Sequence, residues 1–156
     1  MQKLHERTLA RRMAVQALYI SLVTDIGVGE LLEPDCELPD EGHLPAYAKT
    51  LIAGADAHAE EIDALLAEAS ENWSVERMPV VDHAILLLSC YEMFYEESVP
   101  VSVVINEAVE LAKLFGGEDD SARFVNGLLG RIARTYCSDR IADKGADDVP
   151  EVVTEA

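Results

Sequence analysis

Apolar residues recur every three or four positions along most of the chain, which is the period of an amphipathic α-helix. In the first such stretch, TLARRMAVQALYISLV, the residues Leu9, Met13 and Ala17 share one stripe. The stretch over residues 46–70 is rich in alanine and keeps the same spacing. The pattern therefore predicts one long helix over residues 46–70, in which Gly54 is tolerated at some cost.

Three further helices are predicted in the second half of the chain. Pro79 can open a helix over VVDHAILLLSCYEMFY, which is apolar nearly all round, as is typical of a helix in the middle of a core. Pro100 precedes VSVVINEAVELAKLF, which ends at a Gly-Gly pair, and residues 119–121 offer N-cap oxygens to ARFVNGLLGRIARTYC. No segment alternates with a period of two and none is bounded like a hairpin, so the fold is predicted to be all-α.

Two segments lack a helical pattern. Residues 27–45 combine glycine, proline and carboxylates, which indicates a loop and the least ordered internal part of the chain. Residues 139–156 contain six carboxylates and two bases without usable apolar periodicity, so we expect an acidic disordered tail after one helical domain over residues 1–138. One hypothesis for this tail is that it mimics RNA and folds back on basic residues.

Basic residues are concentrated at the N-terminus of a strongly acidic chain. The formal net charge is −18, yet four of the twelve Lys and Arg lie in the first 13 residues: Lys3, Arg7, Arg11 and Arg12. This charge excludes long-range attraction of a polyanion by the whole molecule. A local contact remains possible because the Debye length is about 8 Å at physiological salt. The alternative is that these bases balance nearby acidic surface.

Candidate catalytic and metal-binding residues do not form a convergent set. His58 and Glu61 are three residues apart, but a carboxylate-bridged metal site in a helical bundle needs a second such pair. His83 beside Asp82 fits a packed imidazole better than an acid–base couple. Phosphate-binding loops, dinucleotide fingerprints and nucleophile elbows have no match. We expect no enzymatic activity, no metal and no cofactor.

The cysteine count and the apolar runs bear on the compartment. Cys36, Cys90 and Cys137 are odd in number and lack C-x-x-C spacing, which indicates buried or incidental thiols. The N-terminus has no apolar signal region, and no stretch reaches the roughly 18 apolar residues of a membrane span. These features predict a cytoplasmic protein without a membrane partner.

One turn and a half of the last predicted helix combines Arg123, Phe124, Asn126 and Gly127. In a packing interpretation the phenyl ring is part of the core, the amide bonds a facing helix and the glycine lets two helices approach closely. In a functional interpretation the same residues form a binding surface. The residues alone favour packing.

Three stretches together resemble the family of bacterial transcription antitermination factors called NusB. They are ARRMAVQALY, NWSVERMPVVDHAILLLSCYE and VPVSVVINEAVELAKLFGGEDDSARFVNGLLGRI, and the resemblance covers roughly residues 7–133. It implies an all-α fold of two small helical bundles packed together, with about six or seven helices.

The resemblance also implies a function. NusB proteins pair with the small-subunit ribosomal protein NusE, and the pair binds boxA RNA of nascent ribosomal transcripts in the transcription elongation complex, so that RNA polymerase reads through terminators. No DNA contact is expected. The family roles carry over to the following residues: RNA contacts by Lys3, Arg7, Arg11, Arg12, Arg123 and Phe124, and protein-partner contacts by Tyr19 and Asp82.

Fewer adjacent arginines stand at the N-terminus here than is usual in the family, which weakens the expected RNA contact. The runner-up interpretation is therefore a NusB-like module that binds a basic ribosomal protein with little RNA contact. The fold also resembles the N-terminal domain of some RNA cytosine methyltransferases. That activity resides in a separate cofactor-binding domain, for which this chain is too short.

Overall fold

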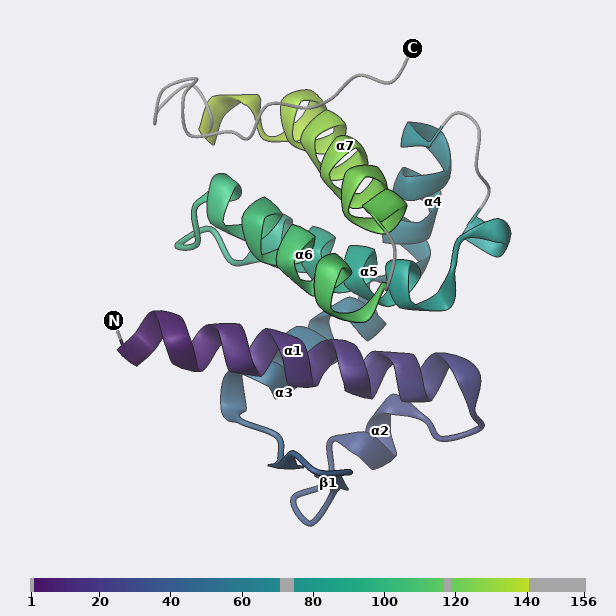
Figure 1. Ribbon diagram of the computed structural model, residues 1–156, viewed down its shortest axis with the longest axis vertical. Helices are drawn as coiled ribbons and strands as arrows, with labels where there is room; N and C mark the ends of the chain where they lie inside the picture. The colour runs from purple at the N-terminus through teal and green to yellow at the C-terminus, as the bar shows by residue number, and fades with distance from the viewer. Residues whose placement is uncertain (1, 71–74, 117–118, 141–156) are drawn as a thin grey trace.

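The computed structural model describes residues 2–70, 75–116 and 119–140. Helices dominate it and pack as two groups, with α1 lying across the middle of the molecule (Figure 1). The first group is formed by α1 (Gln2–Val23), α2 (Val28–Leu31), β1 (Glu37–Leu38), β2 (Gly42–His43) and α3 (Ala46–Ala57). The second group is formed by α4 (Ala59–Ala69), a 3-10 turn η1 (Val75–Arg77), α5 (Val80–Tyr95), α6 (Val101–Phe115) and α7 (Asp119–Tyr136).

Helix α5 joins the two groups, because it packs against α1 and α3 on one side and against α4, α6 and α7 on the other. Ten of its 16 residues are buried, which confirms the prediction of a helix in the middle of the core. The predicted helix boundaries at Pro79, Pro100 and Gly116 are also confirmed: α5 and α6 begin directly after the two prolines, and α6 ends directly before the glycine.

The single long helix predicted over residues 46–70 is wrong. The chain bends at His58, whose φ of −110° and ψ of 14° end α3 and begin α4. The break lets the two halves pack in different groups, since α3 lies against α1 and α5 whereas α4 lies against α5 and α7. Apolar periodicity is continuous across the bend, so the periodicity could not reveal it.

The prediction of an irregular loop over residues 27–45 is also incomplete. It contains α2 and a two-stranded antiparallel hairpin in which Leu38 pairs with Gly42. Positive φ angles at Asp40 and Gly42 form its turn. Strands of two residues are too short to show alternation, and the buried Leu31 and Leu38 attach the segment to the core.

The folded part extends beyond the predicted boundary at residue 138. Residues 138–140 form a further helical turn. The Arg140 guanidinium donates hydrogen bonds to the carbonyl oxygens of Met93 and Val99, the latter at 2.8 Å, and thereby attaches this turn to the end of α5 and to the α5–α6 connection. The predicted disorder of the acidic tail concerns residues 141–156, which lie outside the described residues.

Candidate RNA and protein interface

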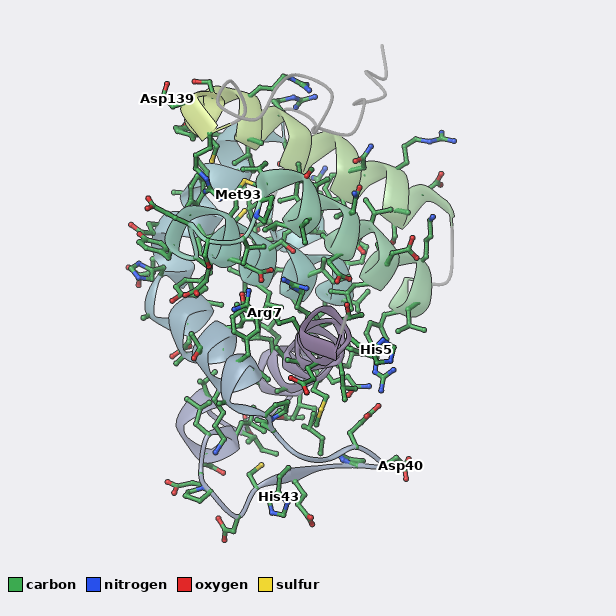
Figure 2. All side chains as sticks on the ribbon, turned by 90° about the vertical axis from the view of Figure 1, so that its left-hand side faces the viewer. His5, Arg7, Asp40, His43, Met93 and Asp139 are labelled. Carbon is green, nitrogen blue, oxygen red and sulfur yellow. The ribbon has the colours of Figure 1, made fainter. Side chains whose placement is uncertain are left out.

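The arginines of α1 point to different surroundings although they are close in sequence. Arg7 and Arg11 are one turn apart on the flank that faces α3, α5 and α6, whereas Arg12 faces the β1–β2 hairpin. Figure 2, in which α1 is seen end-on, shows Arg7 and His5 on opposite flanks of this helix. Lys3 lies in the first turn of α1, and its side chain is outside the described residues.

Arg11 lies inside the protein. Its side chain is 3% exposed and forms a bidentate pair with the equally buried Glu92 of α5, with N–O distances of 2.7 to 3.0 Å. Its remaining terminal nitrogen donates to Glu107 of α6 at 3.0 Å. Glu107 also accepts a hydrogen bond from the Thr8 hydroxyl, and Glu92 accepts one from the hydroxyl of Tyr47 in α3. We therefore correct the expectation that Arg11 contacts RNA: its donors hold α1 against α3, α5 and α6.

The surroundings of Arg11 and Tyr47 favour the protonated form of both side chains. Burial on its own lowers the pKa of Arg11, but the hydrogen bond and charge of Glu92, together with the charge of Glu107, raise the pKa above its ordinary value. Burial and the bond to Glu92 raise the pKa of Tyr47 well above its ordinary value, so its hydroxyl stays protonated and donates. The formal charges of Arg11, Glu92 and Glu107 sum to −1.

Arg7 is held differently. Its guanidinium carbon lies 4.5 Å from the centre of the Tyr47 ring, which is the geometry of a cation–π contact. Within the part of the chain that the structure describes, Arg7 forms no hydrogen bond or ion pair. The side chain is partly exposed, so its N–H donors are available to a ligand.

Arg12 pairs with a carboxylate of the hairpin turn. Its terminal nitrogen lies 3.0 Å from Glu41, and the two side chains are 38% and 21% exposed. Any phosphate that contacts Arg12 must therefore compete with Glu41. The pair also attaches the hairpin to α1.

The α7 residues predicted to contact RNA lie apart from α1. Arg123 is exposed, and Phe124 is partly buried against the core. Figure 1 shows α6 between α1 and α7, so these residues and the arginines of α1 belong to helices that do not lie side by side.

A mostly apolar groove of about 580 Å³ lies beside α1. Its walls come from α1, from the β1–β2 hairpin, from the start of α5 and from the end of α6. Tyr19 and Val80 are 42% and 39% exposed along it. Tyr19, predicted to contact a protein partner, therefore belongs to an apolar surface that could accept an apolar segment of another chain.

Asp82, the other predicted partner residue, is 2% exposed. It is in the first turn of α5, next to the groove residues Val80 and Val81, and one of its oxygens accepts the Ser121 hydroxyl at 3.2 Å. The other oxygen has no partner among the described residues. Burial raises the pKa of Asp82, although the bond from Ser121 lowers it. In the free chain its carboxylate thus lies behind the groove wall and not on the surface.

The two histidines considered for metal binding and for acid–base chemistry have separate neighbours. His83 pairs with Asp63 of α4 at 2.6 Å, not with the adjacent Asp82. His58 stacks on Tyr95, with ring centres 4.2 Å apart, and bonds Glu61. Among the residues that the structure describes, no three His, Cys, Asp or Glu side chains are grouped so that they could hold a metal ion.

Sequence reasoning missed Tyr47, Glu92 and the hairpin carboxylate Glu41. A signal for Glu92 was present, since a carboxylate on a helix that is apolar nearly all round needs a buried partner. Periodicity offers no such signal for Glu41, because its contact depends on the folding of the hairpin.

These features define a helical interaction protein with a basic first helix and a separate apolar groove. Residues 8–134 match the model of the NusB family. The transcription antitermination protein NusB of Halalkalibacterium halodurans is 41% identical over 131 residues, which are 83% of this chain and 95% of that protein. The chain belongs to the NusB family.

Solved structures agree with this assignment. A NusB structure from T. maritima superposes with a TM-score of 0.71 at 31% identity and covers 86% of this chain and 96% of its own. A chain in a crystal structure of the antitermination factors NusB and NusE with double-stranded RNA superposes with a TM-score of 0.70 at 28% identity. That match covers 85% of this chain and 98% of the other. None of the helices in the described ranges has both the length and the apolar character needed to cross a bilayer.

Proposed function

We propose that this chain is a transcription antitermination factor that binds boxA-type single-stranded RNA together with the ribosomal protein NusE. It would act in the transcription elongation complex as a non-catalytic adaptor in the cytoplasm. The observation that carries the proposal is the match to the NusB family over residues 8–134. The similarity to a chain from a NusB–NusE–RNA complex supports it.

On the RNA side the proposal rests on Arg7 and Arg12 of α1, with Lys3 at the start of the same helix. Arg123 and Phe124 of α7 add a second contact region, where an aromatic ring can stack on an unpaired base. Few cations are involved, so RNA affinity from this chain alone is expected to be weak. A protein partner that adds its own RNA contacts then becomes part of the mechanism.

The partner side of the proposal is the apolar groove beside Tyr19. An apolar segment of NusE that covers Tyr19 and Val80 would bury surface that the free chain exposes. Asp82 would contribute indirectly, because its hydrogen bond from Ser121 of α7 fixes the start of α5, which forms one wall of the groove.

A titration of labelled boxA RNA tests the RNA contact, performed with and without NusE at several salt concentrations. NusE should tighten RNA binding, with a logarithmic salt slope of about −2 for roughly three phosphates. Arg7→Ala should weaken RNA binding and leave NusE binding intact. Arg134→Ala, which removes an exposed charge from the last turn of α7, is the matched control and should change little. No gain in RNA affinity on adding NusE would refute the adaptor function.

The second candidate function is a protein-interaction module with little RNA contact. The neutralised surroundings of Arg11 and Arg12 favour it, because both guanidinium groups are already paired with carboxylates. In that case Arg7→Ala leaves RNA binding by the complex unchanged, whereas a charge in the groove abolishes NusE binding. Val80→Asp provides this charge, and Val23→Asp, at an exposed valine that does not line the groove, is its control.

A further inference from the structure

Tyr47 lies where the buried Arg11 network meets the more exposed Arg7. We propose that Tyr47 is a positioning residue for RNA binding, whose ring fixes the Arg7 guanidinium in the orientation that receives a phosphate. The inference deepens the RNA contact of the proposed function and rests on it. It assigns a specific task to a residue of α3, a helix that contributes no other RNA contact to the proposal.

The ring itself is well anchored. Tyr47 is the second residue of α3, in the turn that follows the Pro45 cap, and is partly buried against the core. Its hydroxyl donates to Glu92 at 2.5 Å, and Glu92 is fixed in turn by the bidentate pair with Arg11. The Arg11 guanidinium also lies 5.9 Å from the centre of the same ring. The ring is therefore a fixed platform on which Arg7 rests.

The contact orders Arg7 without occupying its donors. The attraction between a guanidinium and a ring face acts on its charge and requires no hydrogen bond, so none of its five N–H donors has to be used. Arg7 makes no hydrogen bond to a described residue, so these donors can form a bidentate contact with a phosphate. Fixing an arginine side chain costs rotamer entropy, and the contact with the ring means that part of this cost is already met in the free protein.

The contact also preserves the positive charge. Arg12 is ordered by the carboxylate of Glu41, which cancels its charge and must be displaced by a phosphate. Arg7 is ordered by a neutral ring, because the raised pKa of Tyr47 keeps its hydroxyl protonated. On an acidic protein with few accessible cations, an arginine that is ordered without being paired with a carboxylate is the better phosphate ligand.

The test is a double-mutant cycle on the full chain with its protein partner and the boxA RNA. Tyr47→Leu removes the ring and should weaken RNA binding roughly two- to fivefold, the range of a cation–π contact at an exposed site. Tyr47→Phe keeps the ring, removes the hydroxyl and should stay within about twofold of wild type. In the Arg7→Ala background, Tyr47→Leu should cause no further loss. Partner affinity should be the same for all of these variants.

The outcomes separate the inference from the proposed function. If Arg7→Ala leaves RNA affinity unchanged, the proposed RNA contact itself is refuted. If Arg7→Ala weakens RNA binding but Tyr47→Leu does not, the positioning role is refuted. It is refuted equally if Tyr47→Leu weakens RNA binding as much in the Arg7→Ala background as in the wild type. NMR of the free wild-type chain provides a measurement that does not depend on the variants folding. Ring-current shifts of the Arg7 side-chain protons support the contact between Arg7 and the Tyr47 ring, and random-coil shifts refute it.

Discussion

Replacing Arg11 by methionine should strongly destabilise the protein, although this arginine belongs to the basic stretch of α1. The change removes every N–H···O contact that Arg11 makes to Glu92 and Glu107 and leaves the Glu92 carboxylate, 2% exposed, with the Tyr47 hydroxyl. Breaking a buried ion pair by removing one partner costs about 3 to 5 kcal/mol. For a domain of this size, each kcal/mol lowers Tm by roughly 2 to 4 °C.

Urea unfolding followed by far-UV circular dichroism measures this loss. Arg12→Met is the matched control, because it removes a partly exposed pair with Glu41 and should cost only about 1 kcal/mol. The double variant Arg11→Met with Glu92→Met removes both buried charges and should be at least as stable as Arg11→Met alone. Equal stability of Arg11→Met and Arg12→Met would refute the buried network.

Two further changes test the packing and the electrostatics of α5. Gly54→Ala should cost about 1 to 3 kcal/mol of unfolding free energy, because the added methyl group would overlap the ring of Tyr91. Gly29→Ala is the control, since no atom lies near the added methyl group, and it should cost none. Equal stability of the two variants in urea unfolding would contradict this packing. Burial raises the pKa of Asp82, so wild-type stability should fall as pH rises through that pKa, whereas Asp82→Asn, which keeps an acceptor for the Ser121 hydroxyl, should lack this loss. Its advantage over wild type in thermal unfolding should therefore grow as pH rises above about 4, the ordinary pKa of an aspartate, and parallel pH profiles would disprove the assignment.

The burial of Arg11 limits which arginine variants of α1 can test RNA binding. A variant with all three arginines replaced would lose the buried pair, so lost RNA binding could result from unfolding alone. Arg7 and Arg12 are the informative single positions, since their side chains are partly exposed. Because Arg7 contacts a tyrosine ring and Arg12 a carboxylate, the contributions of the two arginines to RNA binding should depend differently on salt concentration.

The apolar spacing by itself determined that the protein is helical and where most helices lie. Pro79, Pro100 and Gly116 marked helix ends because their effects on the backbone are local. The family motifs, which depend on residue order alone, likewise identified a NusB protein. These properties could be predicted because neighbours in sequence decide them.

Only the tertiary structure decided what each charged residue does. Arg7 and Arg11 are equivalent in the sequence pattern, yet one is partly exposed against a ring and the other is buried between two carboxylates. Glu92 and Glu107 are more than 80 residues away from Arg11 along the chain, and the Glu41 hairpin meets Arg12 across 29 residues. Whether a cation is buried or available depends on which carboxylates the packed helices bring beside it, and periodicity carries no information about such distant contacts.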